Sequence, residues 1–286
     1  MLGDLVLYQK QPPLPLFISP SKKETNVKKA VLCIAGMTDG LLSLPYTQKL
    51  IDGLPEYHIV QMLLSSSYNQ WGLQSLDSDA DQICLAVSVL VDEFKFEQVV
   101  IFGHSTGCQD VIHTLLHRKD HACFPHLRSA VMQAPVSDRE AFIMFDKKGV
   151  EESISVARSV EDKEDLLPRN LMSKLGWNNV PMTARRWLSV ADLNGQDDYF
   201  SSDLSNDFVK STFGQVTIPL LALIGEKDEY MPPEVDKQKL VDLWRSNSDG
   251  SRFEAAIIPG ATHKIEDESA QNELVVQVKN FLEKYM

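Results

Sequence analysis

The sequence predicts an α/β protein with a mainly parallel central sheet flanked by helices, and three observations lead to this fold class. Apolar runs of strand length alternate with amphipathic helical patterns over most of the 286 residues. Runs such as 30–34 and 98–102 are almost uninterrupted in their apolar character, which is typical of parallel strands covered on both faces. The pentapeptide Gly-His-Ser-Thr-Gly at 103–107 stands between such a run and a helical pattern.

The strands of the first half are apolar runs bounded by turn residues. Three prolines between 12 and 15 confine the first two runs to a sheet edge, because proline cannot donate a ladder hydrogen bond. The run 30–34 ends in the glycine-containing loop 35–40, and α/β sheets bind ligands at such carboxyl ends. The expected elements are strands 5–8 and 14–18, a solvated loop at 22–29, and strands 30–34, 57–64, 98–102 and 127–134.

Helices are expected where apolar residues recur at helical spacing. In the segment 77–94, for example, Ile83, Val87, Leu90 and Val91 fall on one face. The expected helices of the sheet domain are 41–52, 77–94, 108–116, 236–245 and 270–285.

The alternation stops in the middle of the chain. Residues 136–216 contain no convincing buried strand, but acidic and mixed helical stretches and a polar loop. Strand patterns resume at 218–225 and 253–258. We therefore expect residues 1–135 and 217–286 to form the core and residues 136–216 to form an inserted, mostly helical cap.

Ser105 at the apex of the pentapeptide is the candidate nucleophile. A strained turn would project its hydroxyl above the sheet, and Gly103 and Gly107 are small where strand and helix approach most closely. The bland interpretation is an ordinary strand-to-helix turn. The strand before the pentapeptide and the helix after it favour the catalytic interpretation.

A serine hydroxyl is a weak nucleophile, so it needs a base and a third group that orients the base. In this fold class the order along the chain is Ser, then acid, then His. Asp228 and His263 follow the last two expected strands in that order, which places both beside Ser105. Asp203 and Glu226 are the next candidates for the acid.

Two backbone amides must stabilise the negative charge that develops on the carbonyl oxygen during attack. The amide of Thr106, directly after the serine, is expected to be one. The second is expected from the loop after the strand 30–34, where Met37 is the first candidate and Thr38 the alternative.

The sequence indicates neither a metal nor a cofactor. His113, His117 and His121 lie four residues apart, with Cys123 and His126 nearby, but three such histidines span two helical turns and cannot all meet one ion. The alternating aspartates 77, 79 and 81 lack the glycine and terminal glutamate of a calcium loop, so they are better explained as a charge cluster at a helix N-terminus.

The composition restricts the expected binding partners and the expected cellular compartment of the protein. Forty acidic against 28 basic residues give a net charge of −12, which repels nucleic acid and anionic lipid surfaces alike. The four cysteines lack framework spacing, which is typical of reduced thiols. No apolar run reaches membrane-spanning length, and no secretory leader pattern opens the chain. A cytoplasmic protein is expected, and its oligomeric state is not indicated.

With these motifs the chain resembles the α/β-hydrolase superfamily over nearly its whole length. The segments 36–41 (Gly-Met-Thr-Asp-Gly-Leu) and 197–204 (Asp-Asp-Tyr-Phe-Ser-Ser-Asp-Leu) resemble the branch that contains fungal siderophore esterases. The resemblance implies ester hydrolysis by Ser105, Asp228 and His263. The His-Gly that commonly precedes the oxyanion loop is Ala-Gly at 35–36, so the second amide stays open between Met37 and Thr38.

The resulting hypothesis is a serine carboxylic-ester hydrolase that works through an acyl-enzyme on a small-molecule ester. Thr38, Tyr199 and Phe200 are expected to contact the substrate. Siderophore-type esters carry free amines, for which Asp197, Asp198 and Asp203 are the expected partners. Thioesters and amides stay open as substrates. The alternative from another class is a binding protein or receptor that keeps the fold but turns over little.

Overall fold

The computed structural model describes residues 1–21 and 27–286, so residues 22–26 of the expected loop 22–29 lie outside the described part of the chain. The described residues form an eight-stranded sheet in the order β1-β2-β4-β3-β5-β6-β7-β8. Neighbouring strands from β4 to β8 pair in parallel. The strands are β1 (Asp4–Gln9), β2 (Leu14–Ile18), β3 (Lys29–Ile34), β4 (His58–Met62), β5 (Gln98–His104), β6 (Leu127–Gln133), β7 (Leu220–Gly225) and β8 (Phe253–Ile258). The predicted fold class is confirmed.

The two N-terminal strands form one end of the sheet, but only β1 is a true edge. β2 pairs antiparallel with both β1 and β4. Pro15 is tolerated inside β2 because its carbonyl accepts a hydrogen bond from the Leu63 amide at 3.1 Å, while the donor that proline lacks is not needed there.

The main helices follow the predicted order, with differences at their ends. The helix expected at 41–52 is limited to α1 because Pro45 interrupts it and Leu42 has a positive φ of 64°. The short helices α5 and α6 were not predicted individually. The helices are α1 (Thr47–Gly53), α2 (Leu76–Asp92), α3 (Thr106–His117), α4 (Asp138–Ser159), α5 (Arg169–Lys174), α6 (Ala184–Ala191), α7 (Asn206–Thr212), α8 (Lys237–Asn247) and α9 (Glu268–Tyr285), with short 3-10 turns η1 (Tyr68–Leu73), η2 (Phe124–His126) and η3 (Phe213–Gln215).

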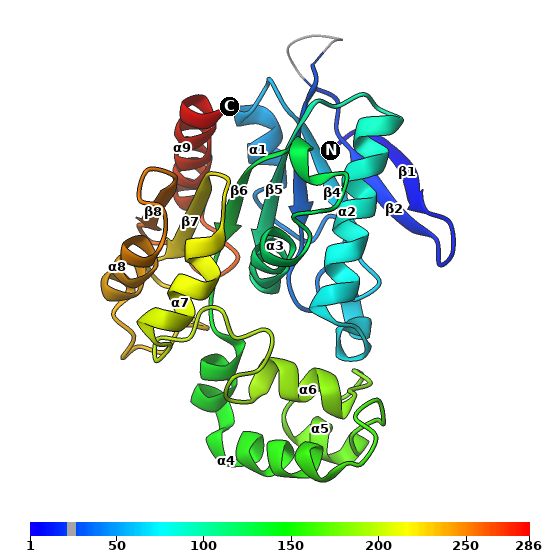
Figure 1. The fold of residues 1–286 in the computed structure, drawn as a ribbon, viewed down its shortest axis with the longest axis vertical. Helices are drawn as coiled ribbons and strands as arrows, with labels where there is room; N and C mark the ends of the chain where they lie inside the picture. The colour runs from blue at the N-terminus through cyan, green and yellow to red at the C-terminus, as the bar shows by residue number, and fades with distance from the viewer. Residues whose placement is uncertain (22–26) are drawn as a thin grey trace.

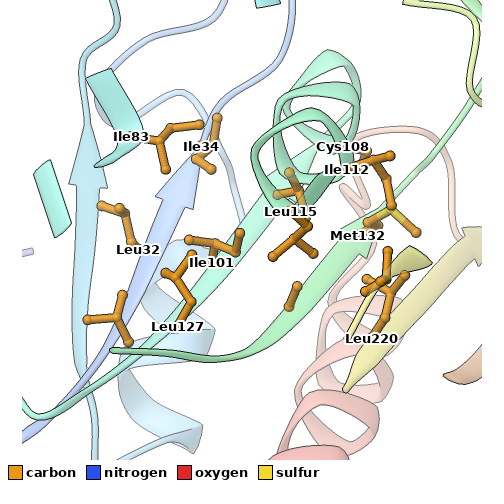
Figure 2. Close-up of a cluster of buried hydrophobic side chains, with 14 of the residues drawn as sticks. Leu32, Ile34, Ile83, Ile101, Cys108, Ile112, Leu115, Leu127, Met132 and Leu220 are labelled. Carbon is orange, nitrogen blue, oxygen red and sulfur yellow. The ribbon is translucent and has the colours of Figure 1, made fainter. Parts of the chain in front are cut away.

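Helices cover both faces of the sheet, and strand residues alternate between two apolar layers. Leu32 and Ile101 face the layer of α2, α3 and α8, whereas Val31 and Val100 face the layer of α1 and α9. Figure 2 shows α3 side chains, including that of Leu115, gathered over strand residues of the first layer. The central strands β3, β5, β6 and β7 are therefore buried on both sides, as their apolar runs predict.

The segment between β6 and β7 divides into two parts. Helices α4, α5 and α6 lie together beyond one end of the sheet (Figure 1) and share an apolar cluster centred on Trp187. The later part turns back to the sheet, where Phe213 stacks on Trp244 of α8 with ring centroids 5.3 Å apart. Within the described residues of this segment, pairing is limited to one isolated bridge between Leu166 and Thr183.

Strand β5 and helix α3 meet without room for a side chain. A Cβ added at Gly103 would collide with the backbone carbonyl of Gly107, and one added at Gly107 would lie 2.5 Å from the carbonyl oxygen of Ile34. Gly103 therefore sets the distance between β5 and α3, and Gly107 lets α3 approach the end of β3.

We predict that Gly103→Ala lowers the free energy of unfolding by about 1–3 kcal/mol, because backbone atoms must move apart to accept the methyl group. The matched control is Gly250→Ala, where no atom lies within 4 Å of the added Cβ, and its effect should stay within about 0.5 kcal/mol. Equilibrium unfolding in urea measures both. Equal midpoints for the two variants would contradict the packing argument.

Candidate active site

Ser105 occupies the tight turn between β5 and α3. Its backbone has φ 54° and ψ −123°, a strained conformation for a residue with a side chain. The Ser105 amide donates to the carbonyl oxygen of Gln133 at the end of β6, at 3.0 Å. Gly36, at the end of β3, approaches so closely that an added Cβ would lie 2.8 Å from the Cβ of Ser105. Backbone from three strands thus fixes the position of the hydroxyl.

His263 and Asp228 complete a hydrogen-bonded chain with this serine. His263 Nε2 lies 2.8 Å from Ser105 Oγ, and His263 Nδ1 lies 2.9 and 3.0 Å from the two Asp228 oxygens. An ionised carboxylate only accepts, so Nδ1–H donates to Asp228, and Nε2 accepts from the serine hydroxyl. Asp228 follows β7 and His263 follows β8, so the structure brings together the three residues that the sequence singles out.

The alternative acids are engaged elsewhere. Glu226 accepts a hydrogen bond from the Gly260 amide at 2.7 Å, and Asp203 pairs with Arg139. The Asp228 carboxylate also accepts from the Tyr230 amide at 3.1 Å, which holds it in place under the imidazole.

A buried polar cluster behind the serine was not anticipated from the sequence. The Gln133 amide nitrogen donates to the carbonyl oxygen of His263 at 3.1 Å, and its oxygen accepts from Tyr46 at 2.9 Å and from Nδ1 of His104. Burial lowers the pKa of His104 to about 3, so its ring is neutral. The available signal was a glutamine at the carboxyl end of an otherwise apolar strand, next to a histidine inside the pentapeptide itself.

The hydroxyl of Ser105 opens into a cavity of about 400 Å³ between the carboxyl end of the sheet, helices α4 and α6, and the turn after α5. Aromatic side chains form much of the wall that these helices and the loop after β7 contribute. They are Phe142, Phe145, Trp177, Trp187 and Tyr230. The volume fits a small organic molecule, and the aromatic wall fits an apolar portion of it. No pattern in the sequence marked these residues as a cavity wall, because only the orientation of the helices turns them toward the serine.

The residues expected to form the oxyanion hole lie next to Ser105 in the structure. Met37 and Thr38 line the cavity beside Ser105, and Thr106 is the first residue of α3, directly after the serine. Neutral backbone amides at a helix N-terminus and in a tight loop can stabilise a developing negative charge without a metal.

Tyr199 and Phe200 differ from their expected role, because the structure does not bring them to the cavity. Both are buried in the apolar layer under α3 and α8, with 4% and 1% of their surface exposed. The Tyr199 hydroxyl lies 2.9 Å from Nδ1 of His113, and Phe200 packs against Trp244. Burial of large aromatic area in the core outweighed their placement between carboxylates.

The three aspartates expected to bind substrate amines are instead paired within the protein. Asp197 accepts two hydrogen bonds from Arg186, at 2.7 and 2.8 Å, and both side chains are buried. Asp198 pairs with Arg139 at 2.7 Å, and Asp203 pairs with the same guanidinium. These carboxylates are therefore occupied by internal cations.

Of the histidines first weighed as metal ligands, His113 is engaged by a carboxylate. His113 Nε2 lies 3.0 Å from Asp77 Oδ1.

The four cysteines are free and buried. None of the helices in residues 1–21 and 27–286 combines the length and apolarity needed to span a membrane.

A second group of buried carboxylates lies behind the loop that contains Met37. Asp79 and Asp110 of neighbouring helices line a small pocket together with Arg186. Oδ1 of Asp79 has no hydrogen-bond partner among the described residues. Burial raises the pKa of Asp79 to about 7, although the nearby Arg186 opposes the rise.

Comparison with known proteins identifies relatives over almost the whole chain. A family described as "Protein of unknown function (DUF1749)" matches residues 4–283. UPF0613 protein PB24D3.06c of Schizosaccharomyces pombe is 33% identical over 91% of this chain and 90% of its own. Fusarinine C esterase sidJ of Aspergillus fumigatus is 32% identical over 90% of each chain.

Solved structures agree with these relatives. The siderophore hydrolase EstB from Aspergillus fumigatus superposes with a TM-score of 0.83 at 29% identity, over 100% of this chain and 98% of its own. An α/β-hydrolase fold protein superposes with a TM-score of 0.74 at 21% identity, over 99% of this chain and 96% of its own. The fold is the α/β-hydrolase fold, and the resemblance seen in the sequence is confirmed.

The raised pKa of Asp79 predicts a pH-dependent stability. Between the unfolded pKa of about 4 and the folded pKa of about 7, the folded protein keeps a proton on Asp79 that the unfolded chain has released. Stability from this group is present below pH 4 and is lost as pH rises, with a slope of at most about 1.4 kcal/mol per pH unit. Asp79→Asn should therefore gain stability relative to the parent protein between pH 5 and pH 7.

Urea unfolding at several pH values measures this difference. Asp92→Asn, at an exposed position of the same helix, is the control and should track the parent protein. If the stability of Asp79→Asn changed with pH in parallel with that of the parent protein, the carboxyl of Asp79 would not be the group that takes up the proton.

Proposed function

This chain belongs to the DUF1749 family, and we propose that it is a serine hydrolase that cleaves carboxylic esters through an acyl-enzyme on Ser105. The observation that carries the proposal is the chain of hydrogen bonds from Ser105 through His263 to Asp228, of which Ser105 and His263 line the cavity. Relatives and structural neighbours that are named as esterases or hydrolases support ester hydrolysis.

The geometry supports a two-step reaction. His263 Nε2 takes the hydroxyl proton as Ser105 Oγ attacks the ester carbonyl, and it passes that proton to the departing alcohol. Water then attacks the acyl carbonyl and His263 Nε2 accepts its proton. The bond from the acyl carbon to Ser105 Oγ breaks, His263 returns the proton to Oγ, and the acid product leaves. Asp228, with a fully buried side chain, holds the imidazole in the productive tautomer and stabilises its protonated form.

The amides of Thr106 and of Met37, with Thr38 as the alternative, are proposed to receive the negative charge of the tetrahedral intermediate. Their support is position: one begins α3 directly after the nucleophile, and the others line the cavity after β3. Each such donor contributes about 3 kcal/mol of transition-state stabilisation.

Residues 136–216 are proposed to act as the substrate-selecting cap, with α4, α5 and α6 as the part that meets the substrate. Siderophore-type esters are the proposed substrates because the sidJ and EstB relatives are named for them. The carboxylates that line the cavity are Asp39, Asp138 and Asp146.

Only one of these carboxylates is available to a substrate amine. Asp39 pairs with Lys264 at 2.7 Å, and desolvation raises the pKa of Asp138 to about 8, which keeps it neutral near pH 7. Asp146, exposed at a kink in α4, is the proposed amine partner. The comparisons favour an enzyme over a binding protein with little turnover.

We predict that Ser105→Ala keeps the fold but loses hydrolysis and labelling by a fluorophosphonate probe, which reacts only with an activated serine. His263→Ala should lose as much activity as the serine variant, and Asp228→Asn as much or less, because the three residues act as one unit. Steady-state kinetics on a small acyl ester and labelling followed by intact mass test this. Undiminished labelling of Ser105→Ala would place the nucleophile elsewhere.

For the substrate class, Asp146→Asn should raise KM for an amine-bearing fusarinine-type ester about two- to fivefold, the range of an exposed ion pair. It should leave the N-acetylated analogue unchanged. Asparagine can still accept from the Gly149 amide, as Asp146 does at 3.0 Å, so the helix is preserved. Asp207→Asn, on the exposed side of α7, is the control. Brisk cleavage of simple acyl esters with none of either siderophore would leave a general carboxylesterase.

A further inference from the structure

Away from the cavity, on the helical layer that contains α2, two thiols and an imidazole lie close together. Cys84 comes from α2, and His121 and Cys123 come from the segment between α3 and β6. One ligand atom of each residue lies within 4.8 Å of the others. None of these residues takes part in the hydrolytic site, so the group needs its own explanation.

We propose that Cys84, Cys123 and His121 form a Zn²⁺ site with water as the fourth ligand. In a tetrahedral site with Zn–S bonds of about 2.3 Å, two sulfur atoms stand about 3.8 Å apart. Ligand atoms within 4.8 Å therefore have to close by at most about 1 Å for the sulfur pair and about 1.3 Å for a sulfur–nitrogen pair. Small rotations of the side chains achieve this without rebuilding the backbone.

The donor set and its surroundings fit this ion. Two thiolates and an imidazole are soft to borderline ligands, which suit Zn²⁺ and exclude Mg²⁺ and Ca²⁺. The cysteines are 1% and 2% exposed, so bound metal would be shielded from water on their side. The exposed His121 ring leaves an entry path from solvent.

A carboxylate does not complete the site. Asp81 lies one helical turn before Cys84, but it accepts from Arg118 Nε at 2.7 Å. The fourth position therefore faces solvent at the histidine, where a water can bind.

The sequence did not reveal this group, because only two of its members lie close together in the chain. His121 and Cys123 are two residues apart, whereas Cys84 lies on α2. Packing of α2 against α3 and against η2 brings them together. Bound zinc would tie the segment after α3 to α2, a structural role distinct from the ester chemistry at Ser105.

Cobalt titration of the reduced, chelator-treated full-length protein tests the proposal, with Co²⁺ as the spectroscopic stand-in for zinc. We expect one equivalent to bind with thiolate-to-cobalt charge-transfer absorption, and one equivalent of Zn²⁺ to abolish that absorption. Cys84→Ser and Cys123→Ser should lose it. His121→Ala should weaken cobalt binding by about 10- to 100-fold or more, because the loss of a residue that only supports a metal ligand already weakens binding by that factor.

Matched controls separate the site from general metal binding. Cys33→Ser, at another buried thiol, and His126→Ala, beside the site in sequence, should bind cobalt as the parent protein does. Because His121 is exposed, its variant tests the site even if a buried cysteine variant fails to fold. Absence of stoichiometric binding in the reduced protein, or unchanged binding by His121→Ala, would overturn the proposal. So would a Cys84–Cys123 disulfide that forms readily while the reduced form binds no cobalt.

Discussion

The backbone conformation of Ser105 is the constraint on which the rest of the site depends. A non-glycine residue at φ 54° costs about 1–3 kcal/mol and persists only where its surroundings leave no alternative. Here the alternatives are removed by the close contact of Gly103 with Gly107 and by the hydrogen bond from the serine amide to Gln133. This strained conformation holds the hydroxyl at the carboxyl edge of the sheet, 2.8 Å from the imidazole of His263, which follows β8.

How far the sequence predicts this site depends on how local the signal is. Ser105 follows β5 directly, and Asp228 and His263 lie in the loops after β7 and β8. Parallel strands bring their carboxyl ends to one edge, so the local pattern suffices. Tyr199 and Phe200 carry an ambiguous signal, since aromatic residues between carboxylates suit a cavity wall or a core. Contact with α3 and α8 decided for the core, and that contact is not encoded in the neighbouring residues. The same reasoning explains why helix α6 and the aromatic wall escaped prediction.

The net charge is a poor guide to substrate contacts for a related reason. The total of −12 includes the acidic loop after α6, but it does not show that Asp197 is paired with the buried Arg186. A buried ion pair repays its desolvation only when its remaining groups are bonded. Arg186 meets this condition, since its Nε donates to the carbonyl oxygen of Trp71 at 3.1 Å while its Nη1 binds Asp197. Arg186 thus joins α6 to η1, and its partner Asp197 is not free to attract a substrate.

Gln133 links the turn that contains Ser105 to the loop that contains His263, although the two follow different strands. Its carbonyl accepts from the Ser105 amide, and its side-chain nitrogen donates to the His263 carbonyl, so a single residue of β6 supports both the nucleophile and the base. Its side-chain oxygen is fixed in turn by Tyr46 and by the neutral ring of His104. Each polar atom of this amide has a partner, so flipping it would break several buried hydrogen bonds at once. The separation of serine and histidine is therefore set at the carboxyl end of β6, by hydrogen bonds that involve none of the helices α4 to α6.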